Sequence, residues 1–109
     1  MNKEQDIADC TLIAEKLLGW KLINGKCIIK GTSYLSSVIN LKTHIRDYFW
    51  QLWDAVEKKG GVMDIEGQHR VIIWHNNSFT NRTDITSNTI EEALYECCLK
   101  YCKEVVEND

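Results

Sequence analysis

The chain has 109 residues, of which 44% are hydrophobic and 27% are charged, and its formal net charge is −3. This size and balance are typical of one globular domain over residues 1–109, and they exclude a disordered or fibrous chain. The negative charge and the absence of a Lys/Arg run argue against a general binder of nucleic acid or anionic membranes, whose affinity comes from neutralising phosphates. Residues 1–6 are polar and lack the apolar stretch of a signal peptide, so we expect a protein of the cytosol.

The cysteines indicate reduced thiols. There are five of them, an odd number, and Cys97 and Cys98 are adjacent, which is poor geometry for a disulfide between them. Cys98 and Cys102 lie one turn apart on an expected helix, as two metal ligands would. No Cys-x-x-Cys motif or histidine cluster supplies the other two ligands, so we predict no metal site.

The first element is expected to be a helix that begins at Asp6 as its N-cap and stops at Gly19. Its apolar residues recur at helical spacing: Ile7, Cys10, Ala14, Leu17 and Leu18. Residues 20–23 and 26–29 flank Asn24-Gly25, the dipeptide that favours a tight two-residue turn, and this predicts a hairpin. Residues 31–40 are rich in serine without a clear period, so we expect a loop there.

A second helix is predicted from about Leu41 or Thr43 to Lys59, where Gly60 and Gly61 end it. Its apolar face holds Ile45, Tyr48, Phe49, Leu52 and Val56. Residues 62–66 and 69–74 are expected to be the central strands, joined around Gly67. The polar residues 75–88 predict a long loop or one further short strand.

The last helix has the clearest start, because Thr89 is followed three residues later by Glu92, a pair whose side chains cap the first turn. The face expected on the sheet comprises Ile90, Leu94, Cys97, Cys98, Tyr101 and Val105. These elements predict an α+β fold of two to three helices packed on an antiparallel sheet of about four strands.

A second apolar stripe runs along the other side of this last helix. It consists of Tyr95, Leu99, Cys102 and Val106. Either another part of the chain covers this stripe or a second subunit does, since contiguous exposed apolar patches are usually interfaces. We predict a homo-oligomer interface here, with a symmetric dimer as the default.

Trp50 projects from the second helix on the side of Arg46, Asp54 and Glu57, away from the apolar face. One interpretation is partial cover by a neighbouring loop or subunit, since tryptophan is rarely left in water. The other is a stacking surface for an aromatic ligand or a hot spot for a partner protein.

Residues 74–84 gather hydrogen-bonding side chains, one cation and two aromatic rings. Aromatic rings stack on bases, Asn and Thr pair with ribose hydroxyls, and Arg suits phosphate, so this composition is what a nucleotide-like ligand requires. Plain solvated turns have the same residues. The candidate ligand-binding residues are Trp50, Trp74, His75, Asn77, Asn81 and Arg82.

No catalytic signature is present: the sequence has no Gly-rich phosphate loop, His-Glu metal motif or nucleophile elbow. Asp64 and Glu66 lie on the same side of an expected strand, where a solvated face explains them better than acid–base chemistry. We therefore predict a protein that is not an enzyme and needs no cofactor, with a nucleotide hydrolase as the minor alternative.

The order of features resembles the phage ABA-sandwich domain, a family of small proteins from bacteriophages and prophages. The resemblance is carried by Leu18-Gly19-Trp20, by the serine-rich loop at residues 33–37, by Val56-Glu57-Lys58-Lys59, and by the helix that opens at residues 89–94. It implies a phage accessory protein that acts in the cytoplasm of an infected bacterium. The function expected from it is sequestration of a nucleotide-type host immune signal by a homo-oligomer. The alternative is a protein–protein inhibitor or adaptor that acts on a host defence protein.

Overall fold

The strands of the described chain form two antiparallel sheets of three. A computed structural model describes residues 3–23, 26–28, 35–75 and 81–106. The first sheet has the order β1 (Lys21–Ile23), β2 (Lys26–Ile28), β3 (Leu35–Ser37). The second has the order β4 (Val62–Glu66), β5 (Arg70–Trp74), β6 (Arg82–Thr86). Sequential strands are neighbours in both sheets, so each is a meander without crossovers.

The helices are interrupted or extended by tighter and wider turns. The first, α1 (Lys3–Leu12), continues into a π-helical turn, η1 (Ile13–Leu17), and the last, α4 (Ile90–Tyr101), continues into a second one, η3 (Cys102–Val106). Between them lie α2 (Asn40–Thr43), a 3₁₀ turn η2 (Ile45–Tyr48) and α3 (Phe49–Lys58). None of the helices in the described ranges is long and apolar enough to cross a membrane.

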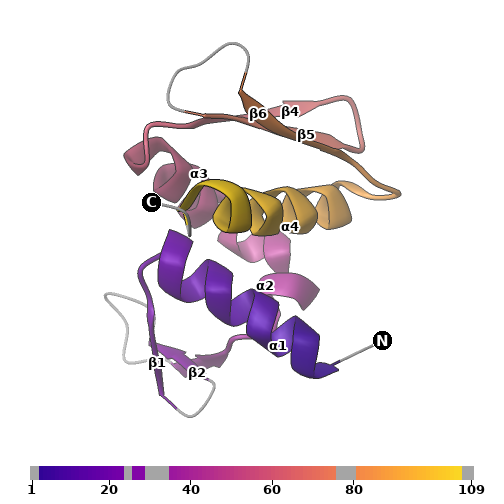
Figure 1. The fold of residues 1–109 in the computed structure, drawn as a ribbon. Coiled ribbons are helices and arrows are strands. Elements are labelled where there is room, and N and C mark those ends of the chain that lie inside the picture. Colours follow the sequence, from indigo (N-terminus) through magenta and orange to yellow (C-terminus); the bar gives the residue numbers. More distant parts are fainter. Residues whose placement is uncertain (1–2, 24–25, 29–34, 76–80, 107–109) are drawn as a thin grey trace.

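Figure 1 shows these elements in layers, with β4, β5 and β6 at the top, α4 beneath them, α1 beneath α4 and the β1–β2 hairpin at the bottom. α4 packs on β5 and β6 on one side and contacts α1 on the other, while α3 contacts β4. The hydrophobic core therefore has two parts, one on each side of α4. Buried Val71 and Ile73 line its upper part, and buried Cys10 and Ile13 line its lower part.

The predicted α+β class is confirmed, with four helices packed on a three-strand antiparallel sheet. The expected hairpin is present, because Ile23 pairs with Lys26, although residues 24–25 of its turn lie outside the described residues. The sheet expected to have about four strands is instead divided into two sheets of three. Within residues 31–40, expected to be a loop, Leu35–Ser37 pairs with β2 and α2 begins at Asn40. The alternative of one more strand in residues 75–88 is the observed one, since β6 pairs with β5.

The start of the first helix was predicted wrongly. The helix already includes Lys3, and Asp6 pairs with Lys42 at 2.8 Å instead of capping. Ile7 is 38% exposed, whereas Ile13, outside the expected stripe, is buried. The π-helical turn takes more residues per turn than an α-helix, so positions before and after it do not follow one 3.6-residue spacing. Gly19, with φ at +71°, ends the helix as expected.

The second helix is not continuous as predicted. His44, with φ −131° and ψ 43°, leaves the helical region and separates α2 from the 3₁₀ turn and α3. The predicted apolar face is nevertheless correct, since Ile45, Leu52 and Val56 are buried. Gly60, with φ at +85°, follows the helix end.

The second apolar stripe of α4 is covered by the chain itself. Tyr95 is 7% exposed and Cys102 is 0% exposed, because α1 and η1 lie over them, and Cys10 Sγ lies 3.9 Å from the Tyr95 hydroxyl. Leu99 is half-buried against the same core, and the side chain of Val106 lies outside the described residues. Tyr95 and Cys102 are therefore not available to the subunit interface predicted on this stripe. Self-association stays a prediction, and this stripe gives it no support.

Candidate functional site

The most exposed large apolar side chain among the described residues is Trp50, at 70% exposure. It belongs to an aromatic cluster on α3, with its ring centroid 5.1 Å from that of Phe49 and 6.2 Å from that of Trp53. The Trp53 indole N–H donates to Glu57 Oε1 at 2.7 Å, which fixes that ring. The Trp50 indole has no such hydrogen bond to any of the described residues, and its side chain is held only by these ring contacts.

Beside Trp50 lies a groove of about 370 Å³, here called the Trp50 groove. Three elements meet in it, namely α3 with the 3₁₀ turn before it, β4, and the first turns of α4. Its lining residues are Arg46, Phe49, Trp50, Ile65, Ile90, Glu91 and Leu94. Its walls are apolar, and Ile65 is itself 37% exposed. Such a concave apolar surface with a few polar groups at its rim is typical of a binding site.

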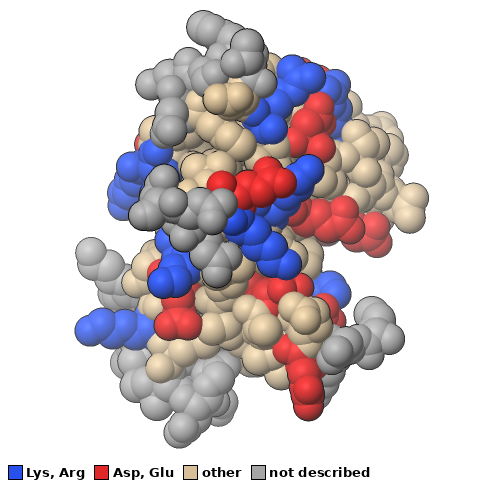
Figure 2. Space-filling model, viewed as in Figure 1, with Lys and Arg blue, Asp and Glu red and all other residues tan. Residues whose placement is uncertain are grey.

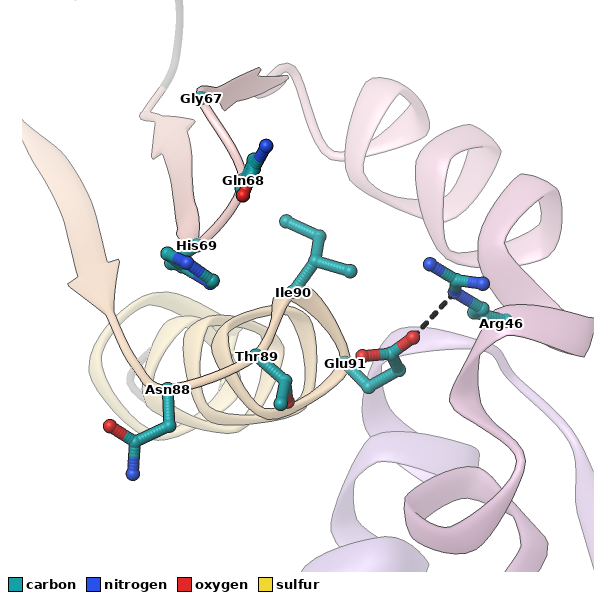
Figure 3. A pocket seen from close by; sticks show the side chains of 8 residues that line it. All are labelled: Arg46, Gly67, Gln68, His69, Asn88, Thr89, Ile90 and Glu91. Atoms are coloured by element: carbon teal, nitrogen blue, oxygen red, sulfur yellow. Dashed lines mark ion pairs between the residues drawn. The ribbon is translucent and has the colours of Figure 1, made fainter.

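Two residues that line the Trp50 groove form an ion pair, with Arg46 Nε 2.6 Å from Glu91 Oε1. Figure 3 shows this pair joining the helix α4 to the segment before α3, next to a second hollow of about 410 Å³. That hollow is lined by Gln68 and His69 of the β4–β5 turn and by Asn88 and Thr89 just before α4. Arg46, Ile90 and Glu91 line both, so the two hollows are adjacent. Thr89 is held there as the helix cap, since its Oγ1 accepts the Glu92 N–H at 3.1 Å.

Of the predicted ligand-binding residues, the structure brings Trp74 and Arg82 together. They are opposite each other on β5 and β6, and the Arg82 guanidinium lies 5.2 Å from the centre of the Trp74 ring. This is a cation–π contact on the face of the sheet that turns away from α4. Arg82 also lies 3.7 Å from Asp84. The charge of Arg82 is therefore partly neutralised by Asp84 within the sheet.

The other predicted residues are placed elsewhere. His75 points to the helix side of the sheet, where its Nε2 lies 2.7 Å from Thr83 Oγ1 and its ring centroid 5.5 Å from that of Tyr101. Asn81 is exposed and its carbonyl accepts the His75 N–H at 2.9 Å. Asn77 lies outside the described residues.

Trp50 does not join this group. It shares its groove with Ile65, whereas the β4 residue paired with Trp74 is Val62, three residues or about 10 Å away along the strand. The six candidates therefore do not form one pocket in the described structure.

On the outer face of the second sheet, carboxylates of neighbouring strands form ion pairs with an arginine between them. Arg70 donates to Asp84 through two nitrogens, at 2.9 and 2.5 Å, and to Glu66 at 2.9 Å. The hydrogen bonds from Arg70 lower the pKa of Asp84. Glu66, noted in the sequence with Asp64, is thus held by a neighbouring strand, as expected for a solvated strand face. Figure 2 shows that basic and acidic side chains are also interspersed on the face of the molecule seen there.

The cysteines described lie inside the core. Burial raises the pKa of Cys10 to about 11 and that of Cys97 to about 12, and it raises the pKa of Cys98 as well. These thiols are therefore protonated at neutral pH. Among the residues that the structure places, no three His, Cys, Asp or Glu side chains are grouped as metal ligands would be.

The free energy of unfolding is expected to fall below pH 6.5 because of His75. Burial lowers the pKa of this imidazole from its ordinary value of 6.5, so the unfolded chain takes up the proton first. Stability is therefore full above pH 6.5 and declines as the pH falls towards the folded-state pKa. Urea unfolding of the wild type and of His75→Gln between pH 5 and 8 measures this, and the variant should lose that part of the slope. A slope that is the same in both proteins would contradict it.

The sequence indicated Trp50 as an anomaly, and this side chain is 70% exposed, but the sequence gave no sign of the groove beside it. Comparisons of the chain with protein-family models, with curated proteins and with solved structures find no match. The resemblance to the phage ABA-sandwich domain thus stays a prediction.

Proposed function

We propose that this protein is a non-enzymatic binding protein whose Trp50 groove takes up an apolar side chain of a partner protein. The observation that carries this proposal is Trp50 itself, 70% exposed at the rim of an apolar groove. Leaving an indole in water forfeits roughly 1.5–3 kcal/mol of burial free energy, so an exposed tryptophan gains most from a partner. Tryptophan is also among the residues that dominate binding energy at protein interfaces.

The charges around Trp50 favour a partner with basic residues beside its apolar side chain. Glu57 lies seven residues after Trp50, on the same side of α3, and Glu91 lines the groove. Among the described residues, Arg46 is the only cation that lines the groove, and it is paired with Glu91. In the setting that the sequence resemblance implies, the partner is a defence protein in the cytoplasm of an infected bacterium.

Replacing Trp50 by alanine should weaken partner binding at least 30-fold without affecting the fold. Selection of random peptides from a displayed library on the purified protein should enrich aromatic or aliphatic residues flanked by Lys or Arg. Affinity of the enriched peptides for Trp50→Ala should fall at least 30-fold, which corresponds to about 2 kcal/mol. The melting temperature should stay that of the wild type, because the side chain is mostly in water.

The matched control is Ile7→Ala, another exposed apolar residue, on α1 and away from the groove. It should bind the same peptides as the wild type. Enriched peptides that bind Trp50→Ala as tightly as the wild type would refute the proposal.

A second candidate function is sequestration of a nucleotide-type signal by a homo-oligomer, and the contact between Arg82 and Trp74 supports it. A cation beside an aromatic ring suits a phosphate joined to a planar base. The test is to incubate the protein with cyclic dinucleotides and ADP-ribose-type signals, remove free ligand, denature by heat and analyse what is released. Release of intact ligand supports sequestration, and release of a converted product supports a hydrolase. If no ligand is released, the result favours binding of a protein partner.

A further inference from the structure

A third groove, of about 550 Å³, lies between the end of the first helix and the second half of α3. We call it the Trp20 groove. One wall is Glu15, Lys16, Leu17, Leu18, Gly19 and Trp20, and the other is Gln51, Asp54, Ala55, Lys58 and Lys59. It shares no lining residue with the Trp50 groove. Its volume is within the range of roughly 300–1,000 Å³ that small-molecule sites have.

Three lysines that form no ion pair with any described residue line this groove. Within the described residues, Lys42, Lys100 and Lys103 each pair with a carboxylate, whereas Lys16, Lys58 and Lys59 do not, and neither does Lys21 outside the groove. All three are exposed, and they outnumber the two carboxylates of the lining, Glu15 and Asp54. The groove thus carries a positive excess, although the protein as a whole has a net charge of −3. Positive charges gathered around a concavity attract anions.

Trp20 gives the same groove an aromatic wall that is held in place. The backbone N–H of Trp20 donates to the Ala14 carbonyl at 2.8 Å, across the turn at Gly19. Its ring meets the edge of Tyr48, with centroids 5.6 Å apart and planes at 69°. The ring is half-buried on the core and lines the groove. A fixed aromatic surface in a groove is a stacking platform for a planar group.

We infer that the Trp20 groove binds a nucleoside phosphate, with the base stacked on Trp20 and the phosphates held by Lys16, Lys58 and Lys59. Ammonium groups bind phosphate as mobile point charges, and stacking on an aromatic ring accepts any base. The inference stands independently of the protein partner proposed for Trp50. It gives the second candidate function a site different from the one at Trp74 and Arg82.

A purely structural explanation of the lysines is that they offset the negative end of α3, where the helix carbonyls point. It accounts for Lys58 and Lys59 at that end, and for Lys16 at the end of the first helix. This explanation predicts no preference for a ligand that combines phosphates with a base. The two explanations therefore differ in a measurable way.

The experiment is an NMR titration of the ¹⁵N-labelled protein with ATP, tripolyphosphate and adenosine in parallel. We expect ATP to shift the signals of the Trp20 indole, Gly19 and Gly60, and to bind at least tenfold more tightly than either of the other two. Changing Lys58 and Lys59 to glutamine together should weaken ATP at least tenfold. Lys100→Gln, at an exposed lysine outside the groove, should not change it. Trp50→Ala should also bind ATP normally, which separates this test from that of the protein partner.

The inference is overturned if millimolar ATP leaves these signals unmoved, or if it moves those of Trp74 and Arg82 instead. It is overturned as well if adenosine or tripolyphosphate binds as tightly as ATP, or if the double lysine variant keeps full affinity. The altered lysines are exposed, so these variants should fold as the wild type does. A spectrum with the signal dispersion of the wild type checks this.

Discussion

Replacing Ile73 by alanine is expected to lower the free energy of unfolding by about 3–4 kcal/mol. Ile73 is 0% exposed in β5, the central strand of its sheet, where it pairs with Met63 on one side and Thr83 on the other. The removed methyl and methylene groups would leave a cavity that a strand fixed on both edges cannot close. Urea unfolding followed by circular dichroism measures the loss, which is a large part of the 5–15 kcal/mol that a typical domain has.

The control for this experiment is Val62→Ala on the adjoining strand. Val62 is 44% exposed, so its truncation should cost no more than about 0.5 kcal/mol. Equal losses in the two variants would show that β5 is not at the centre of the core.

Gly61→Ala is expected to destabilise the protein by about 1–3 kcal/mol through crowding. A Cβ at this position would lie 3.0 Å from the Trp74 carbonyl oxygen, 3.0 Å from Val56 Cγ1 and 3.2 Å from the Tyr101 hydroxyl. The Trp74 carbonyl is fixed at the end of β5, so it yields less than a side chain would. Three elements, α3, β5 and α4, therefore meet at the backbone of residue 61. Thermal unfolding of the single variant gives the size of the effect.

The cause can be separated from ordinary glycine effects with two further variants. Gly67→Ala meets nothing within 4 Å, and its cost of about 1 kcal/mol arises from its φ of +64° alone. Val56→Ala removes one of the contacts at residue 61. In this background Gly61→Ala should cost less stability than it does in the wild type, whereas the cost of Gly67→Ala should be unchanged. Additive losses in both double variants would contradict the crowding explanation.

Much of the fold follows from patterns within single segments. The cap at Thr89 depends on Glu92 three residues away, and the strand pair around Gly67 depends on a turn of a few residues. Such features are readable because the interactions that cause them are close in sequence. The break at His44 was not readable, since nothing in the local spacing distinguishes residues 40–48 from a continuous helix.

The cover of α4 is the clearest case of what the sequence leaves open. The stripe at Tyr95, Leu99 and Cys102 required a covering element, and the sequence allowed either this chain or a second one. The structure supplies α1, with a contact between Cys10 and Tyr95, which are 85 residues apart in sequence. Periodicity shows that a face is apolar, but it does not show which distant segment lies on it.

The same limit applies to the candidate sites. Trp50 was identifiable because an aromatic residue off the apolar face is a local anomaly. Its groove was not, since Ile65 and Ile90 reach it from β4 and α4. The Trp20 groove likewise combines residues near 16 and near 58, which only the folded chain brings together.

The position of α4 between two layers has a consequence for how the molecule opens. Detachment of either the upper sheet or the first helix would expose one apolar side of α4 to water. Separating either layer from the rest is therefore costly in free energy. The backbone amides of α4 should therefore exchange with deuterated solvent only when the whole chain unfolds. The backbone amides of the β1–β2 hairpin, which follows the first helix, can exchange during smaller, local openings.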